Sequence, residues 1–292
     1  AVRPAFCGCG WGADPAGGAG GLAETGYLPD TATATAVFLA DRLRKPLLVE
    51  GPAGVGKTEL ARAVAQATGS GLVRLQCYEG VDEARALYEW NHAKQILRIQ
   101  AGSGDWEATK TDVFSEEFLL QRPLLTAIRR TEPTVLLIDE TDKADIEIEG
   151  LLLEVLSDFA VTVPELGTLT ATRAPFVLLT SNATRELSEA LKRRCLYLHI
   201  DFPTPELERR ILLSRVPELP EHFAEELVRI IGVLRGMQLK KVPSIAETID
   251  WGRTVLALGL DTIDDAVVAA TLGVVLKHQS DQQRATGELR LN

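Results

Sequence analysis

One short stretch constrains the fold of this chain more than any other. It reads VEGPAGVGKTELA at 49–61 and fills every fixed position of the pattern G-x-x-x-x-G-K-[ST] with Gly51, Gly56, Lys57 and Thr58. A short apolar run precedes it, and a helix-favouring run follows it. The order of strand, glycine loop and helix predicts a phosphate-binding loop in an α/β protein with a central parallel sheet.

Such a loop suits a nucleoside triphosphate such as ATP, because backbone N–H groups at the start of a helix can surround its phosphates. The predicted nucleotide-binding residues are Gly51, Pro52, Ala53, Gly54, Val55, Gly56, Lys57, Thr58 and Glu59. Lys57 would reach the β- and γ-phosphates, and the Thr58 hydroxyl would ligate Mg²⁺. The alternative is a glycine turn before a purely structural helix, but the number of fixed positions favours the phosphate loop.

A second apolar run, at 134–138, ends in the acidic pair Asp139 and Glu140. A continuously apolar strand is typical of the centre of a parallel sheet, whose strands bind ligands at their carboxyl ends. We therefore predict that Asp139 holds Mg²⁺ and that Glu140 orients or deprotonates the attacking water. The alternative is that both cap the next helix. Asp142 and Asp145 could be helix-start residues only.

Asn182 follows another predicted strand, at 176–180. At the carboxyl end of that strand its side chain could hydrogen-bond the γ-phosphate or the attacking water. An ordinary turn asparagine explains the position equally well. The last strand is predicted at 195–200, after a short helix at 187–194 that carries a run of basic residues.

Changes in pattern along the chain predict four parts. They are a glycine-rich disordered tail at 1–24, an α/β nucleotide-binding domain at 25–204, a helical lid at 205–278 and a frayed tail at 279–292. The second part also contains a predicted amphipathic helix at 81–100, an exposed loop at 102–105, a helical segment at 116–129 and a β-hairpin at 160–174.

Composition restricts the possible partners. The net charge of −10 and the absence of a basic stripe argue against nucleic acid. No apolar run is long enough for a membrane span, and four scattered cysteines fit a reducing compartment, so we expect a cytoplasmic protein without membrane insertion. Cys7 and Cys9 could be half of a metal site, although no second pair accompanies them. His92 reads as a packing residue rather than a metal ligand.

Three motifs together resemble the AAA+ ATPases: GPAGVGKT at 51–58, LLIDE at 136–140 and LLTSN at 178–182. Within that group the chain looks like the MoxR family. The segments RLQCYEGVDEARALYEWNHAKQIL at 74–97 and FSEEFLLQRPLL at 114–125 resemble its carbon monoxide dehydrogenase accessory branch, often called CoxD. The resemblance covers about residues 25–277.

The resemblance implies a hexameric ring with ATP between subunits. It also implies a chaperone that remodels or matures a client metalloenzyme, possibly a molybdenum-containing carbon monoxide dehydrogenase, with a von Willebrand factor A domain protein as partner. Carried onto this chain, Asn182 would be the first sensor, and Arg194 or Arg193 the arginine finger reaching the next subunit's γ-phosphate. An exposed basic pair is the alternative for the two arginines. The family's second-sensor arginine has no match at Pro243–Ile245.

Two other functional classes remain open at the level of sequence. One is a nucleic-acid motor or a clamp-loader-like ATPase, which the net charge of −10 disfavours. The other is a switch that binds ATP and a partner without hydrolysis, which has no need of a water-orienting carboxylate such as Glu140.

Overall fold

The computed structural model describes residues 14–101, 112–260 and 262–289. The chain divides into two compact units. The first unit comprises residues up to Thr25, Pro29–Glu50 and Thr58–His199. The second comprises Gly26–Leu28, Gly51–Lys57 and the chain from Ile200 onward.

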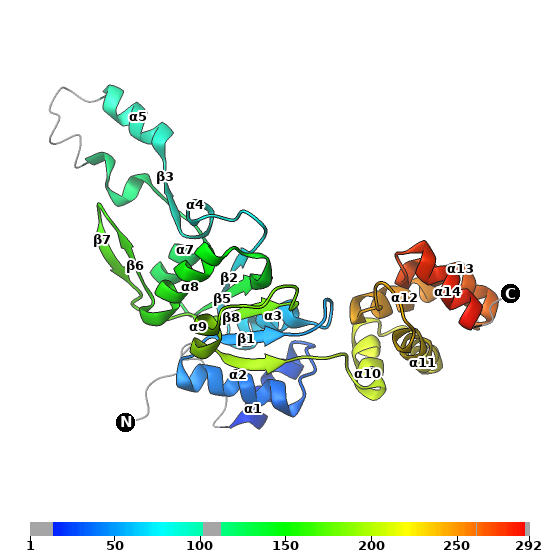
Figure 1. Ribbon diagram of the computed structural model, residues 1–292. Coiled ribbons are helices and arrows are strands. Elements are labelled where there is room, and N and C mark those ends of the chain that lie inside the picture. Colours follow the sequence, from blue (N-terminus) through cyan, green and yellow to red (C-terminus); the bar gives the residue numbers. More distant parts are fainter. Residues whose placement is uncertain (1–13, 102–111, 261, 290–292) are drawn as a thin grey trace. The chain divides into compact units, whose positions relative to one another are not determined.

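A five-stranded sheet forms the centre of the first unit (Figure 1). Its strands, in spatial order, are β2 (Gly71–Gln76), β5 (Thr134–Asp139), β8 (Phe176–Ser181), β1 (Leu47–Glu50) and β9 (Leu196–His199). Every neighbouring pair is parallel. Strands β5 and β8 are buried along their whole length, because helices cover both faces of the sheet. The predicted α/β class with a central parallel sheet is confirmed.

Helices lie on both sides of this sheet, with α7 and α8 on one side and α1 and α2 on the other (Figure 1). The helices of the central layers are α1 (Pro15–Glu24), α2 (Thr31–Leu43), α3 (Lys57–Ala67), α7 (Pro123–Arg129), α8 (Ile146–Asp158) and α9 (Glu189–Arg194). On the side of α7 and α8, apolar side chains of the sheet and of these helices form one buried core. Burial of these apolar side chains stabilises the packing of the helices on the sheet.

The stretch predicted as a single helix at 81–100 is three elements instead. They are α4 (Glu83–Ala86), β3 (Tyr88–Trp90) and α5 (His92–Ala101). The β-favouring residues Tyr88 and Trp90 pair with β4 (Leu119–Gln121), and the Asn91 side chain accepts the Lys94 N–H at 3.0 Å to start α5. Pairing with a distant strand thus outweighed the local helical periodicity. The loop predicted at 102–105 lies outside the described residues.

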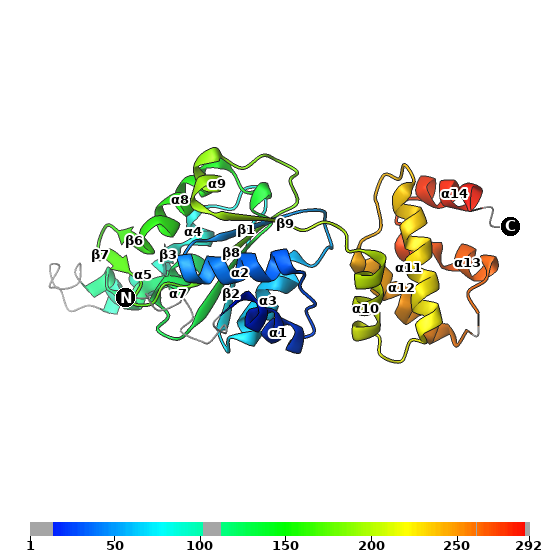
Figure 2. The ribbon, with the colours of Figure 1, turned by 90° about the horizontal axis from the view of Figure 1, so that it is seen from below.

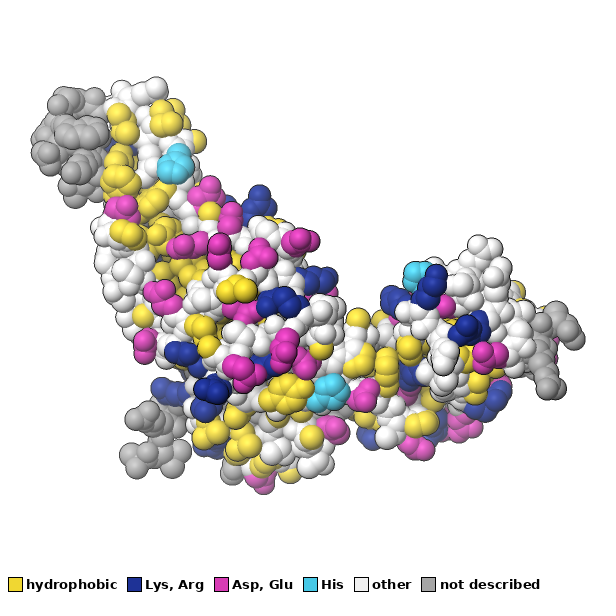
Figure 3. Space-filling view, viewed as in Figure 1, with side chains coloured by type: hydrophobic (Ala, Val, Ile, Leu, Met, Phe, Trp, Pro, Cys, Tyr) yellow, Lys and Arg dark blue, Asp and Glu magenta, His cyan; other side chains and the backbone are white. Residues whose placement is uncertain are grey.

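The segment predicted as helical at 116–129 is also divided. It contains a short 3-10 helix η1 (Glu116–Phe118), then β4, and only then α7. The hairpin expected near 160–174 is present as β6 (Ala160–Val163) and β7 (Gly167–Thr170). On α5, Ile96 and Leu97 are 54% and 66% exposed, and Figure 3 shows apolar side chains gathered on this helix.

The second unit is helical beyond residue 204. Its helices are α10 (Pro205–Arg215), α11 (Glu221–Gly236), α12 (Ile245–Leu258), α13 (Asp265–Val275) and α14 (Gln279–Glu288), and Figure 2 labels them all. Trp251 is fully buried among them, and its indole N–H donates to Thr271 Oγ1 at 2.8 Å. Ser244 and Glu247 form a capping box at the start of α12.

Both segments expected to be irregular contain helices in their described parts. The start of α1 is capped by Asp14, which accepts the Gly17 N–H at 2.8 Å, and Leu22 in this helix is fully buried. In α14, buried Asp281 accepts the backbone N–H groups of Lys240 and Lys241 at 3.0 and 3.2 Å. Buried Leu22 in α1 and buried Asp281 in α14 therefore help to fix segments whose overall composition favours disorder.

Candidate nucleotide-binding site

The predicted phosphate loop is a compact turn between β1 and α3. Gly54 and Gly56 have φ of +77° and +97°, a region that residues with a Cβ rarely adopt. Lys57 is 6% exposed, and its Nζ donates to the carbonyls of Gly51 and Pro52 at 2.7 and 2.6 Å. The lysine thus lies along the turn, with its ammonium group held by loop carbonyls.

Two loop glycines are also required by close approach within the second unit. A Cβ on Gly51 would lie 1.9 Å from the Ile200 carbonyl oxygen, and one on Gly54 would lie 2.4 Å from Ser244 Oγ. Ser244 belongs to the segment Pro243–Ile245, where the family resemblance leads one to look for a second-sensor arginine. Beyond the loop, Glu59 forms a surface ion pair with Arg62 at 2.9 Å.

Asp139 ends β5 and is 2% exposed, yet several donors satisfy its carboxylate. Its Oδ1 accepts from Thr58 Oγ1 at 3.0 Å and from Thr180 Oγ1 at 2.6 Å. The structure therefore brings together the predicted Mg²⁺ residues Thr58 and Asp139. A threonine hydroxyl and a carboxylate are hard oxygen donors of the kind Mg²⁺ prefers, so this pair fits that ion.

Two side chains of β2 contact the acidic pair, and neither was predicted. Arg74 donates to Asp139 Oδ2 from Nε at 3.0 Å and from Nη2 at 2.5 Å. Gln76 accepts a hydrogen bond from Arg74 and donates from Nε2 to Glu140 Oε2 at 2.9 Å. Only the register between β2 and β5, which pairs Gln76 with Asp139, places these groups together.

Glu140 follows Asp139 in the left-handed region, with φ of +56°. Such a backbone conformation is uncommon for glutamate. Its carboxylate accepts from Gln76 and also from Lys143 Nζ at 2.6 Å, and that bond to Glu140 raises the pKa of Lys143. Glu140 thus stands beside Asp139 with its carboxylate held from two sides.

Thr180 is a further site residue that sequence reasoning missed. Its hydroxyl donates to Asp139 and accepts the backbone N–H of Glu140 at 2.8 Å, while its side chain is 1% exposed. One buried hydroxyl on β8 therefore fixes both acidic residues at the end of β5. The signal was present as the polar residue that ends the apolar run FVLLT, two positions before Asn182.

Asp142 holds the loop that carries Asn182. It lies in the 3-10 helix η2 (Thr141–Lys143), and its carboxylate accepts the N–H groups of Asn182 and Thr184 at 3.2 and 3.0 Å. Burial alone would raise the pKa of Asp142, but the hydrogen bonds from Thr184 and Asn182 outweigh it and lower that pKa below 3.8. Asp142 therefore positions the Asn182 loop instead of serving only as a helix-start residue.

The two candidate arginines stand at the exposed end of α9. Arg194 Nε donates to Ser157 Oγ on α8 at 2.8 Å. The position of α9 is set by Glu149 of α8, which is 2% exposed and accepts the Ser188 N–H at 2.8 Å and the Arg185 guanidinium at 2.5 Å. The exposed arginines are thus carried on a helix that is anchored through a buried carboxylate.

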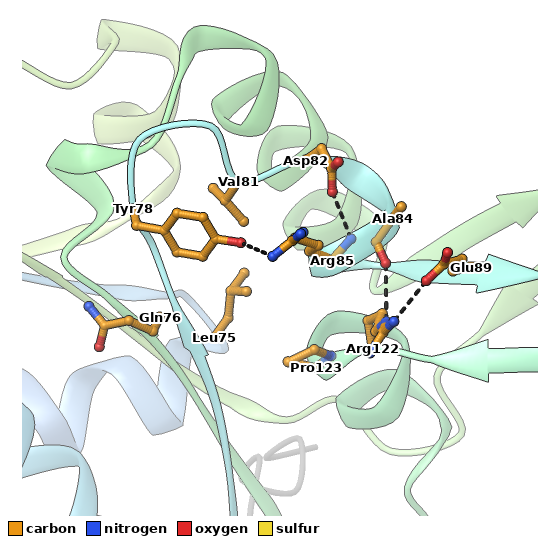
Figure 4. Close-up of a pocket in the computed structure, with 10 residues that line it drawn as sticks. All are labelled: Leu75, Gln76, Tyr78, Val81, Asp82, Ala84, Arg85, Glu89, Arg122 and Pro123. Carbon is orange, nitrogen blue, oxygen red and sulfur yellow. Dashed lines mark hydrogen bonds and ion pairs between the residues drawn. The ribbon is translucent and has the colours of Figure 1, made fainter.

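A cavity of about 680 Å³ opens beyond the end of β2, next to the acidic pair but outside the phosphate loop. Figure 4 shows its charged side chains pairing with near neighbours: Arg85 with Tyr78 at 3.0 Å, and Arg122 with Glu89 at 2.8 Å. Its lining has two arginines and two acidic residues, so it carries no net charge to select an ionic ligand. Gln76 belongs both to this lining and to the contact with Glu140.

The model of the AAA domain, dynein-related subfamily, matches residues 46–195. The chain belongs to this AAA family. The match begins before the phosphate loop and ends after α9, so it contains the loop, Asp139, Glu140, Asn182 and the two candidate arginines. No helix among the described residues is long and apolar enough to cross a membrane. The Cys7–Cys9 pair lies outside those residues.

Two curated relatives are chaperones. Chaperone protein ClpB 1 of Synechocystis is 27% identical over 236 residues, which cover 76% of this chain and 23% of that protein. ClpB 2 of Parasynechococcus marenigrum is 33% identical over 145 residues, covering 48% and 14%. The chain thus spans about a quarter or less of each of these two proteins.

Among solved structures, a mutant form of RuvB from Thermotoga maritima aligns with a TM-score of 0.50. It is 19% identical, and the alignment covers 82% of this chain and 66% of that one. The likeness at this level shows the shared fold, an AAA+ core followed by a helical region.

Proposed function

We propose that this AAA protein binds ATP with Mg²⁺ and hydrolyses it. The observation that carries the proposal is the cluster at the end of β5, where buried Asp139 accepts hydrogen bonds from Thr58 of α3 and Thr180 of β8. A phosphate-loop threonine, a buried carboxylate and an adjacent glutamate are the parts that nucleotide hydrolysis needs.

Each side chain has a separate role in the proposed reaction. Lys57 leaves its loop carbonyls to contact the β- and γ-phosphates, and Thr58 and Asp139 hold the cation. When bound, Mg²⁺ supplies charge neutralisation at the phosphate oxygens. Glu140 accepts a proton from the attacking water or orients that water. The hydrogen bond from the Glu140 backbone N–H to Thr180 fixes the backbone from which the carboxylate side chain extends.

ATP turnover by the purified protein and its Glu140→Gln variant tests the hydrolysis. The variant should bind ATP as tightly as the wild type while its turnover falls at least about a hundredfold, because removal of a general base commonly costs that much. Glu147→Gln, an exposed glutamate on α8, is the matched control and should keep full turnover. Binding of ATP without turnover by the wild-type protein would favour the switch reading instead.

We further propose a ring in which Arg194 or Arg193 acts on the nucleotide of the neighbouring subunit. Both arginines are exposed at the end of α9, and AAA proteins commonly assemble as hexamers. Mixing Lys57→Ala subunits, which keep their arginines, with Arg194→Ala subunits should restore part of the turnover. No rescue in mixed rings, for Arg194 and for Arg193 variants alike, would contradict action between subunits.

The finer assignment is a MoxR-type chaperone that remodels or matures a client metalloenzyme, working with a von Willebrand factor A domain protein. The segments 74–97 and 114–125 support it by resemblance, and the exposed apolar residues of α5 supply a surface suited to another protein. An immature molybdenum-containing carbon monoxide dehydrogenase should raise ATP turnover. Stimulation by DNA that falls steeply with salt would instead favour the nucleic-acid motor.

A further inference from the structure

The donors around Asp139 are shared unevenly between its two oxygens. Thr180 and Thr58 approach Oδ1 at 2.6 and 3.0 Å, and Thr58 lies a little further from Oδ2, at 3.3 Å. Arg74 makes both of its contacts, at 3.0 and 2.5 Å, with Oδ2, so this oxygen accepts from a positively charged donor.

We propose that Arg74 is an internal competitor of the divalent cation at Asp139, and that Gln76 holds Arg74 in that position. Gln76 accepts from the Arg74 guanidinium and donates to Glu140, so a single path of hydrogen bonds joins the two acidic residues through β2. The inference rests on the proposed nucleotide site and adds to it a residue that tunes cation binding.

Competition follows from charge and space. A divalent cation needs oxygen lone pairs of the carboxylate, and a guanidinium bonded to Oδ2 occupies some of them while adding a like charge beside the cation. The competition is weak enough to be reversed, because the Arg74 side chain is 44% exposed and can turn into solvent. Arg74 would therefore lower the affinity for the free cation, while nucleotide phosphates supply further ligands that overcome it.

Mn²⁺ binding to the ADP complex, measured by electron paramagnetic resonance of the free ion, tests the proposal without turnover. Arg74→Ala should tighten Mn²⁺ binding about twofold to fivefold, the range expected for removing a half-exposed ion pair. Arg74→Lys keeps the charge but loses the contact through two nitrogens, and its Mn²⁺ affinity should lie between those of the wild type and Arg74→Ala. Arg229→Ala removes an exposed arginine paired with Glu226 on α11 and should leave Mn²⁺ binding unchanged.

ADP affinity without metal, measured on the same proteins, separates the outcomes. Unchanged metal-free ADP binding together with tighter Mn²⁺ supports the competitor. Equal or weaker Mn²⁺ binding in Arg74→Ala would show that Arg74 positions Asp139 instead, and weaker metal-free ADP binding would show that it contacts phosphate. If the wild-type protein bound no ADP, the proposed function itself would be wrong. If it bound ADP but the Arg74 variants did not change Mn²⁺ binding as predicted, only the role proposed for Arg74 would be wrong.

Discussion

Replacing Thr180 with valine should lower the free energy of unfolding by more than the small change in side-chain shape would suggest. The two side chains are nearly equal in volume, but the hydroxyl of Thr180 makes two buried hydrogen bonds, to Asp139 at 2.6 Å and from the Glu140 N–H at 2.8 Å. A hydrogen bond to a charged group contributes about 1.5–3 kcal/mol, and leaving a donor without a partner adds about 1 kcal/mol or more. We therefore expect a loss of about 2–4 kcal/mol in the free energy of unfolding.

Urea denaturation followed by circular dichroism measures this loss, with two matched controls. Thr134→Val on β5 is also a buried change, but its hydroxyl donates only to the neutral carbonyl of Glu132 at 2.9 Å, so it should cost less than about 1 kcal/mol. Thr180→Ser keeps the hydroxyl and should cost about 1 kcal/mol for the lost methyl group. Equal destabilisation by Thr180→Val and Thr134→Val would refute the argument that the charged partner matters.

Three further predictions follow from single contacts. Hydrogen bonds lower the pKa of Asp142 below its ordinary value of 3.8, so the ionised side chain stabilises the fold above that pH, and this stabilisation is lost as pH falls through the folded-state pKa. The difference in melting temperature between the wild type and Asp142→Asn should therefore shrink on acidification below about pH 4. Burial raises the pKa of the Cys77 and Cys195 thiols to about 12, so both should be thiols and not reactive thiolates at about pH 8. Peptide mapping after iodoacetamide treatment at that pH should find both cysteines unmodified until urea is added. Modification of both in the folded protein would contradict this. Gly54→Ala should weaken ATP binding at least about tenfold, because φ is +77° and the new Cβ would meet Ser244; unchanged affinity by calorimetry would contradict it.

Strands β1, β5 and β8 of the central sheet were predictable because they contain short apolar runs with clear ends. The run at 134–138 needs no tertiary information to read as a buried strand, and the structure has β5 at Thr134–Asp139. The segment 81–100 shows the limit, since its helical periodicity is real but β3 gains a partner in β4, about thirty residues away. A local pattern does not identify a partner strand at that distance, so the β-favouring residues Tyr88 and Trp90 were not enough to predict β3.

The same distinction separates the site residues that were predicted from those that were not. Thr58 and Asp139 belong to motifs that can be read alone, and the structure joins them at 3.0 Å. Thr180 offered a weaker signal, the polar residue that ends an apolar run. Asp142 looked like a helix-start residue because the groups it binds, at Asn182 and Thr184, are about forty positions away.

The contacts of Arg74 and Gln76 with the acidic pair could not be predicted from the sequence, for a reason specific to parallel sheets. Their role depends on β2 lying next to β5, and strand order is not encoded in either strand. Once the two are neighbours, the register pairs Gln76 with Asp139, and side chains two residues apart on β2 share one face. Arg74 then reaches Asp139 along the diagonal while Gln76 reaches Glu140. A slip of one residue would turn both side chains to the opposite face, so the register that builds the sheet core also determines which charge stands beside Asp139.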